Sequence, residues 1–374
     1  MLRTIPRQAA LILAVPFAFY FEHAHANPIL VFILSAVGIL GLISLIGKSV
    51  EEIDHYSGPV IGGLLNATFG NFTELVIAVK GVKAGMFELI RASVTGSILG
   101  NLILVIGLSM FFGGLKHKTQ TFSKTGAQTS CLMLMIVVVA LLIPTFAGLG
   151  YQSLIGAPAA ALLEQKVSLY ASVLLLVVYF LSLLFSLKTH RFAYMPKADS
   201  GNDDEAHPDW SKNASIAVLC VAALCVAATS DVFVESIQTM MKVSNLPIGE
   251  LFMGVFVVAA IGNAVDGMVA VKMACKNKMD IAIQVAMGAS IQVALFIAPL
   301  LVIYSALIGG HPETHIPFTL RFGLFEVIAL GGGVLLAAFD LQDGESNWFE
   351  GVMFIALYVI FGFAFFFLPN MTGM

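Results

Sequence analysis

Two short motifs in the sequence place an amide and a carboxylate on what would be one side of a helix. Each motif has a glycine, an asparagine and an acid in that order: Gly70, Asn71 and Glu74, then Gly262, Asn263 and Asp266. The amide and the acid are three residues apart in both, so on a helix the two side chains share a face. Such oxygens bind hard cations, and a carboxylate also binds a proton. The motifs therefore predict a site for one divalent cation or for protons.

A second group of small and polar residues follows each motif. Gly96-Ser97-Ile98-Leu99-Gly100-Asn101 follows the first, and Gly288-Ala289-Ser290-Ile291-Gln292 follows the second. Both correspondences have an offset of 192 residues, as from Gly70 to Gly262. Two motifs that recur in the same order predict an internal repeat. From these groups the predicted ion pathway takes Gly70, Asn71, Asn101, Gly262 and Asn263.

The composition excludes an ordinary soluble protein. Of the 374 residues, 59% are apolar and 11% are charged, against roughly 45–50% and about 25% in soluble domains. The 19 Lys and Arg residues are scattered, so no basic stripe predicts nucleic-acid binding. No CxxC, HExxH, P-loop or nucleophile elbow occurs, so we expect neither an enzyme nor a resident cofactor.

Eleven apolar segments are long enough to be candidate membrane helices. The first also fits a cleavable signal peptide that ends at Ala24-His25-Ala26, although we favour a retained helix. Thirteen of the 19 Lys and Arg residues fall on one side if the N-terminus is cytoplasmic, and this predicts an external C-terminus. The predicted spans are 8–22, 28–47, 57–80, 86–113, 127–148, 166–187, 211–240, 247–272, 279–308, 318–339 and 347–368.

A hydrophilic segment, residues 190–212, divides the chain. We expect an N-terminal helix in 1–27, a first repeat in 28–189, an acidic cytoplasmic loop in 190–212 and a second repeat in 213–374. An odd number of crossings separates the third span from the eighth, so the repeats are inverted. Inverted repeats place equivalent motifs face to face near the bilayer midplane. The expected fold is an all-α membrane protein, and the expected function is secondary transport.

Two carboxylates inside a membrane explain how transport would be coupled. Each costs at least ~2.5 kcal/mol on insertion scales, so Glu74 and Asp266 require a bound cation or protons. Because the same oxygens bind either, binding is mutually exclusive and exchange is obligatory. Flexible oxygen coordination favours Ca²⁺ over Mg²⁺. Polar residues that only join helices through hydrogen bonds are the structural alternative, and two symmetric copies make it the weaker one.

The motifs resemble those of the cation/proton exchanger (CAX) family of calcium/cation antiporters. Its first signature resembles 62–71 with Thr73-Glu74-Leu75, and its second resembles Gly262-Asn263-Ala264, 276–280 and 290–296. Residues 343–348 and Glu350-Gly351 are also similar to the family. The resemblance implies a Ca²⁺/H⁺ antiporter of ten core helices and one N-terminal helix. Glu74 and the acid at 266 would be the central ligands. The residues that would line the same pathway are Asn66, Asn71, Ser97, Asn263, Ser290 and Gln292.

The chain departs from the family at its second signature. Where the family has Glu followed by His, this sequence has Asp266 and Gly267. Asp reaches about 1.5 Å less far, so exchange of Na⁺, K⁺ or Mn²⁺ remains an alternative to exchange of Ca²⁺. An uncoupled cation channel is a further alternative. The missing His also removes a group that titrates near neutral pH.

Other acids divide into solvated and candidate functional groups. Glu51, Glu52 and Asp54 are expected at a solvated helix end. Asp231 and Glu235 lie four apart and are candidates for a cation or proton vestibule, and Glu326 is a candidate because its neighbours are apolar. The expected partners are Ca²⁺, protons and lipid, and the expected location is a bacterial inner membrane. The oligomeric state is not predicted.

Overall fold

The structure is a computed structural model that describes residues 7–57, 59–190, 208–243, 249–310 and 315–367. Most of the predicted acidic loop, residues 191–207, lies outside the described residues. Within the described ranges the chain is helical except for connecting segments and one antiparallel pair of short strands. The expectation of an all-α protein is therefore confirmed. The chain forms two compact units, which are described separately.

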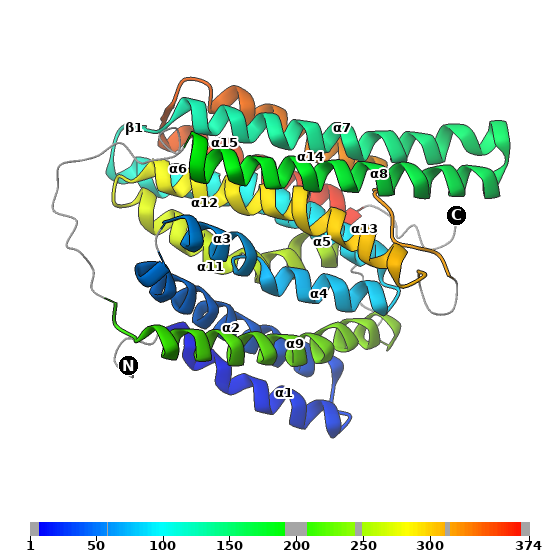
Figure 1. Ribbon diagram of the computed structural model, residues 1–374, viewed down its shortest axis with the longest axis horizontal. Helices are drawn as coiled ribbons and strands as arrows, with labels where there is room; N and C mark the ends of the chain where they lie inside the picture. Colours follow the sequence, from blue (N-terminus) through cyan, green and yellow to red (C-terminus); the bar gives the residue numbers. More distant parts are fainter. Residues whose placement is uncertain (1–6, 58, 191–207, 244–248, 311–314, 368–374) are drawn as a thin grey trace. The chain divides into compact units, whose positions relative to one another are not determined.

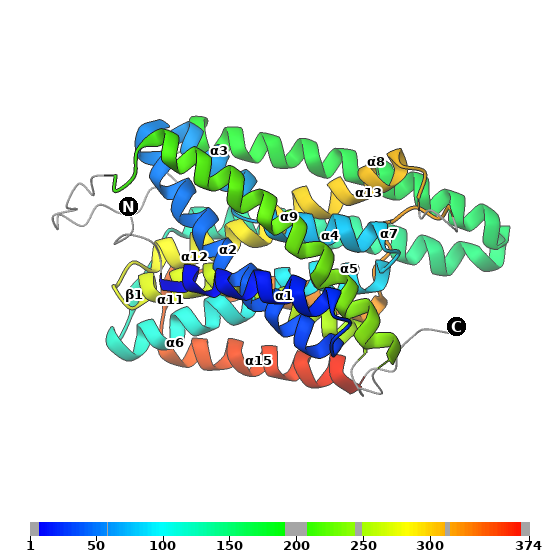
Figure 2. The same cartoon turned by 90° about the horizontal axis from the view of Figure 1, so that it is seen from below.

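The first unit comprises residues 1–86 and 198–247. Figure 2 shows its helices α1, α2 and α9. Apolar side chains join α2 to α9, among them Leu42, Ile46 and Val50 of α2 and Ala222 and Val226 of α9. The described elements are η2 (Arg7–Leu13), α1 (Ala14–His23), α2 (Pro28–Ser57), α3 (Pro59–Phe69), α4 (Phe72–Lys83) and α9 (Lys212–Val243).

The second unit comprises residues 87–197 and 248–374. Figure 1 shows its long helices α7 and α8 side by side. Its elements up to residue 190 are α5 (Phe87–Leu99), η3 (Gly100–Val105), α6 (Ile106–Lys116), β1 (Gln120–Thr121), α7 (Lys124–Ile155), α8 (Ala157–Leu184) and η4 (Phe185–Thr189). The later ones are α10 (Glu250–Phe252), η6 (Met253–Val258), α11 (Ala259–Ala274), α12 (Met279–Gln292), η7 (Val293–Ile297), α13 (Ala298–Leu307), α14 (Leu324–Asp340), β2 (Glu345–Ser346) and α15 (Trp348–Phe367).

Each of the eleven predicted spans coincides with a helical segment. Eight helical segments among the described residues are long and apolar enough to cross a membrane. The others are shorter: η2 with α1, the pair α3 and α4, and α14. The third predicted span, 57–80, is broken into α3 and α4 rather than continuous. The domain boundaries drawn from the sequence stay predictions, because both compact units combine segments from the two halves of the chain.

The first predicted span packs closely on α2 through two glycines. A methyl group at Gly38 would lie 2.6 Å from Cγ2 of Val15, and one at Gly41 would lie 2.6 Å from the backbone nitrogen of Ile12. Glycine is therefore required wherever the N-terminal helical segment crosses α2 at this distance. This segment is thus built into the first unit as a helix.

Glu52 is buried, which corrects the expectation that it lies at a solvated helix end. Its side chain is 1% exposed and contacts Nζ of Lys48 at 2.8 Å. It also accepts a hydrogen bond of 3.0 Å from the backbone N–H of Trp210, whose carbonyl accepts one of 2.7 Å from the hydroxyl of Tyr56. A buried carboxylate needs such partners. Glu52 therefore anchors the segment that leads into α9 to the end of α2.

Two groups of loops in the second unit gather as the predicted spans require. The α6–α7 connection contacts the α11–α12 turn, because Gln120 donates to the carbonyl of Ala274 at 2.8 Å. The same connection meets the α14–α15 connection, where Phe122 N–H donates to the carbonyl of Gly344 at 2.9 Å. The α13–α14 connection instead contacts the start of α8, since Thr319 donates to Glu164 at 2.7 Å. Loops predicted to share a membrane side thus lie together.

Candidate functional site

The first motif forms a break between two helices. The backbone N–H of Gly70 donates to the carbonyl of Asn66 at 2.8 Å, which ends α3. Asn71 is the N-cap residue of α4, with φ of −112° and ψ of 28°. It is buried, and Glu74 lies half-buried in the first turn of α4. The negative charge of Glu74 therefore lies at the N-terminal end of α4, which is the positive end of the helix dipole.

The far end of α4 carries an ion pair. Nζ of Lys80 contacts both carboxylate oxygens of Asp231 on α9, at 2.6 and 2.7 Å. Glu235, the other predicted vestibule acid, is exposed one turn further along α9. Asp231 is thus tied to a cation of α4 rather than open, and its predicted vestibule role stays a prediction.

The second motif lies in an unbroken helix, unlike the first. Gly262 and Asn263 are buried inside α11, and Asp266 follows on the same helix, half-buried. The helix continues to Ala274 without a break. Because α11 is regular here, the three-residue spacing places the amide of Asn263 and the carboxylate of Asp266 on one face, as predicted.

A chain of amide hydrogen bonds surrounds Asn263. Its Oδ1 accepts a bond of 3.2 Å from Nδ2 of Asn101, and its Nδ2 donates at 3.1 Å to the carbonyl of Ser97. Asn101 is fully buried and Asn263 is 6% exposed. Within the described residues Oδ1 of Asn101 accepts no hydrogen bond. A buried carbonyl without a donor is an oxygen left available to a cation.

Two glycines and a π-helical turn bring the residues of this hydrogen-bonded group together. A methyl group at Gly96 would overlap the carbonyl of Val255, and one at Gly100 would lie 2.8 Å from Nδ2 of Asn263. Asn101 lies in η3, a π-helical turn within the membrane helix formed by α5 and α6. Such turns are rare and are frequently found at functional sites. They shift the register of the helix, which re-aims the side chain that follows.

The ninth predicted span repeats these features. Ser290 is fully buried and donates to the carbonyl of Ile98 at 3.4 Å and to that of Ala286 at 3.0 Å. The π-helical turn η7 begins at Val293, within one residue of the position that the 192-residue offset gives from η3. Gln292, half-buried, is the last residue before η7. The internal repeat thus extends from sequence to backbone conformation.

Glu326 is held by two donors at the start of α14. It is 1% exposed. Its Oε1 accepts a bond of 3.0 Å from the hydroxyl of Thr95, and its Oε2 accepts one of 2.7 Å from Gly323 N–H. The second bond is a capping interaction. Glu326 therefore links the beginning of α14 to Thr95 of α5, which lies two residues before Ser97.

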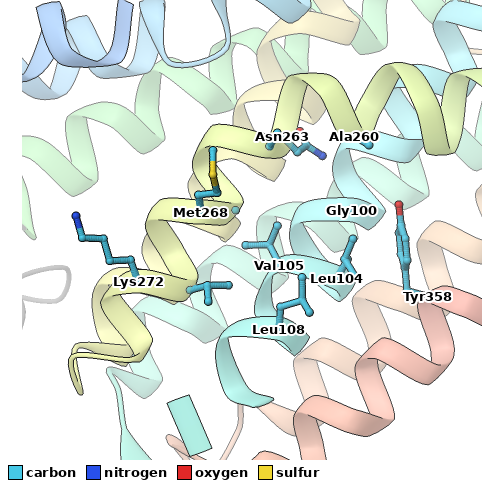
Figure 3. Close-up of a pocket in the computed structure, with 12 residues that line it drawn as sticks. Gly100, Leu104, Val105, Leu108, Ala260, Asn263, Met268, Lys272 and Tyr358 are labelled. Atoms are coloured by element: carbon cyan, nitrogen blue, oxygen red, sulfur yellow. The ribbon is translucent and has the colours of Figure 1, made fainter. Parts of the chain in front are cut away.

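Tyr358 lies near the hydrogen-bonded amides of Asn101 and Asn263, and no sequence motif predicts it as a site residue. It belongs to α15 and lines a cavity with Gly100 and Asn263 (Figure 3). A methyl group at Gly100 would lie 4.0 Å from its hydroxyl. Figure 3 shows that hydroxyl directed toward the part of α11 that carries Ala260 and Asn263. No motif surrounds Tyr358 in its apolar span, so only packing could identify it.

Known proteins resemble this chain over nearly its whole length. Residues 27–188 and 214–367 match the sodium/calcium exchanger protein family. The Ca²⁺/H⁺ antiporter ChaA of Bacillus subtilis is 39% identical over 95% of this chain and 97% of its own length. The vacuolar calcium ion transporter of Schizosaccharomyces pombe is 36% identical over 91% of this chain and 80% of its own length.

Solved structures show the same fold. Native YfkE superposes with a TM-score of 0.79 and 34% identity, over 96% of this chain and 99% of its own. The H⁺/Ca²⁺ exchanger CAX has a TM-score of 0.72 at 13% identity, over 98% of this chain and 88% of its own, and shows the fold alone. The fold is the all-α, inverted-repeat antiporter fold, which confirms the prediction from the sequence. The chain belongs to the sodium/calcium exchanger family, as a multi-pass membrane transporter and not an enzyme.

Proposed function

We propose that this chain is a secondary antiporter that exchanges Ca²⁺ for H⁺, with Glu74 and Asp266 as the carboxylates that bind either ion. Relatives at 35–39% identity over at least 91% of this chain are named Ca²⁺/H⁺ antiporters. The observation that carries the site is the amide chain around Asn263, because it leaves a buried carbonyl oxygen beside the second carboxylate motif. Oxygen ligands of this kind suit Ca²⁺.

The exchange follows from charge balance. Ionised carboxylates inside a membrane are costly unless a cation or protons neutralise them. One Ca²⁺ or two protons neutralise Glu74 and Asp266 equally, so each leaves only when the other arrives. Neutral oxygens complete the coordination and position the acids without adding charge. These pathway residues are Asn66, Gly70, Asn71, Ser97, Asn101, Gly262, Asn263, Ser290 and Gln292.

The experiment is transport by purified protein in liposomes. An imposed proton gradient should drive Ca²⁺ uptake, with proton movement in the opposite direction. Glu74→Gln and Asp266→Asn should each abolish uptake while the protein stays folded and inserted. Glu345→Gln, a change at an exposed acid of the short strand β2, should transport as the unmodified chain does. Wild-type uptake in both site variants would refute the paired-carboxylate mechanism, and Ca²⁺ flux without proton movement would indicate a channel.

One observation favours a second candidate, exchange of another cation. Asp266 and Gly267 stand where the resembled family has Glu and His. A carboxylate one methylene shorter changes the size of the coordination sphere that it completes. Na⁺, K⁺ and Mn²⁺ tested in the same liposomes decide between the candidates. If the shorter acid sets the selectivity, Asp266→Glu should change the preferred cation and not only the rate.

A further inference from the structure

The second unit contains a cavity of about 430 Å³ between η3, α6, α11 and α15 (Figure 3). Its α11 wall runs from Ala260 to Lys272, with Asn263 one turn from the first end and Lys272 at the other. Asn263 and Lys272 are nine residues apart, which corresponds to about 13 Å along a helix. The walls between them are almost wholly aliphatic. They include Leu104, Val105, Leu108, Ala264, Met268 and Val271. The cavity is therefore elongated along α11, apolar in the middle and polar at both ends.

These walls suit a hydrocarbon chain better than water. A buried water needs two to four polar partners, and the middle of the cavity offers none. An empty apolar space forfeits the dispersion contacts that its lining atoms would make. Its size lies within the roughly 300–1,000 Å³ of sites that bind small organic ligands, and such sites combine apolar walls with a few polar groups. An acyl chain supplies the missing contacts.

Lys272 supplies a charge for the head group of such a ligand. Its side chain is exposed, and Figure 3 shows its ammonium directed away from Val105 and Leu108, outside the apolar chamber. No acid forms an ion pair with Lys272 in the part of the chain that the structure describes. Lys276 follows four residues later, beyond the end of α11 at Ala274. Basic groups at the end of a membrane helix attract anionic lipid head groups.

We infer that this cavity is a binding site for an anionic phospholipid. One acyl chain lies along α11 from Val271 toward Gly100, and the phosphate pairs with Lys272. Lipid tails are as apolar as the cavity walls, so transfer from the bilayer gives no hydrophobic gain. Two contributions therefore determine binding: the fit of one chain to the cavity, and the attraction between phosphate and ammonium. The second contribution makes the site selective for anionic over zwitterionic lipid.

Photolabelling in nanodiscs tests the inference. The probes are phosphatidylglycerol and phosphatidylcholine that carry the same diazirine in one acyl chain, and labelled peptides are identified by mass spectrometry. Phosphatidylglycerol should label peptides that contain Leu108, Val271 or Tyr358 more strongly than phosphatidylcholine does. A lysine near an anionic head group contributes about fivefold in affinity. Lys272→Gln should therefore lower phosphatidylglycerol labelling by about that factor, and Lys276→Gln should lower it less.

A second pair of variants tests how the acyl chain fits the cavity, rather than how Lys272 attracts the phosphate. Leu108→Trp places a larger side chain in the cavity and should remove labelling by both lipids. Leu115→Trp changes an exposed residue of the same helix outside the cavity, so its labelling should be unchanged. Equal labelling by the two lipids would overturn the inference, and so would labelling that survives Leu108→Trp. If free fatty acid displaces the probe but phosphatidylglycerol does not, the phospholipid is the wrong occupant.

Discussion

The amide of Asn263 is held by hydrogen bonds at both of its polar atoms. Both of its polar atoms are engaged, by Nδ2 of Asn101 and by the carbonyl of Ser97. These two bonds fix which atom of each amide faces which neighbour, and Oδ1 of Asn101 has no donor among the described residues. Asn101 therefore has two roles at once: it orients Asn263 and it presents a ligand oxygen.

Replacing Asn101 should impair both stability and cation binding. Asn101→Leu leaves the buried Oδ1 of Asn263 without its donor, and an unsatisfied buried polar atom costs about 1–3 kcal/mol. Thermal unfolding in detergent should show the loss, and Ca²⁺ should raise the unfolding temperature less than it does in the unmodified protein. The matched control is Ser109→Ala, which removes a fully buried hydroxyl that has no hydrogen-bond partner among the described residues. A variant as stable and as Ca²⁺-responsive as the control would contradict the dual role.

At the scale of elements, the site depends on how closely α5 approaches η6. Gly96 faces the backbone of Val255, and Gly254 faces Ala92 and the carbonyl of Leu89. Small residues on both helices permit this distance, as is usual where membrane helices pack tightly. Ser97 follows Gly96 directly, so the same approach brings its carbonyl to Asn263.

Gly96→Ala should separate these helices. The added methyl group would meet backbone atoms of Val255, which cannot move aside as a flexible side chain can. Overpacking of this kind typically costs about 1–3 kcal/mol, and exchange should fall with it because the carbonyl of Ser97 moves away from Asn263. Gly288→Ala is the control, since a methyl group there meets nothing within 4 Å. Unfolding temperature and Ca²⁺ uptake measured on both variants check the expectation; equal behaviour would show that α5 has room to move.

The sequence identifies the helices and most of the described site because composition and spacing act locally. Spans follow from runs of apolar residues, and Asn263, Ser97 and Asn101 follow from a repeated pattern. Local patterns do not reveal which copy of a motif breaks its helix: α3 ends just before Gly70, whereas α11 continues through Gly262. The exposure that the sequence predicts for Glu52 is wrong, since this buried carboxylate accepts a hydrogen bond from Trp210, 158 residues away in the sequence. Tyr358 approaches Gly100 only through the packing of α15.

For the whole chain, the strongest sequence prediction is that loops alternate between two membrane sides. The second unit agrees with it. Gln120 joins the α6–α7 connection to Asn277 in the α11–α12 turn at 3.1 Å, and β1 pairs with β2 of the α14–α15 connection. The other side gathers the start of α5, the start of α8 and the α13–α14 connection, where Arg91 and Glu164 contact Thr319. An even number of crossings separates the members of each group, as their contacts require.

The excess of lysine and arginine predicts which of these two sides is cytoplasmic. Lys276 belongs to the group with β1 and β2, whereas Lys166 belongs to the group with Arg91 and Glu164. If the N-terminus is cytoplasmic, Lys276→Cys should resist a membrane-impermeant maleimide added to intact cells, and Lys166→Cys should react. Both residues are exposed, so burial does not explain a difference. The background has Cys131, Cys220, Cys225 and Cys275 replaced by Ser. After permeabilisation both variants should react, and the opposite pattern in intact cells would invert the orientation while keeping the alternation of loops.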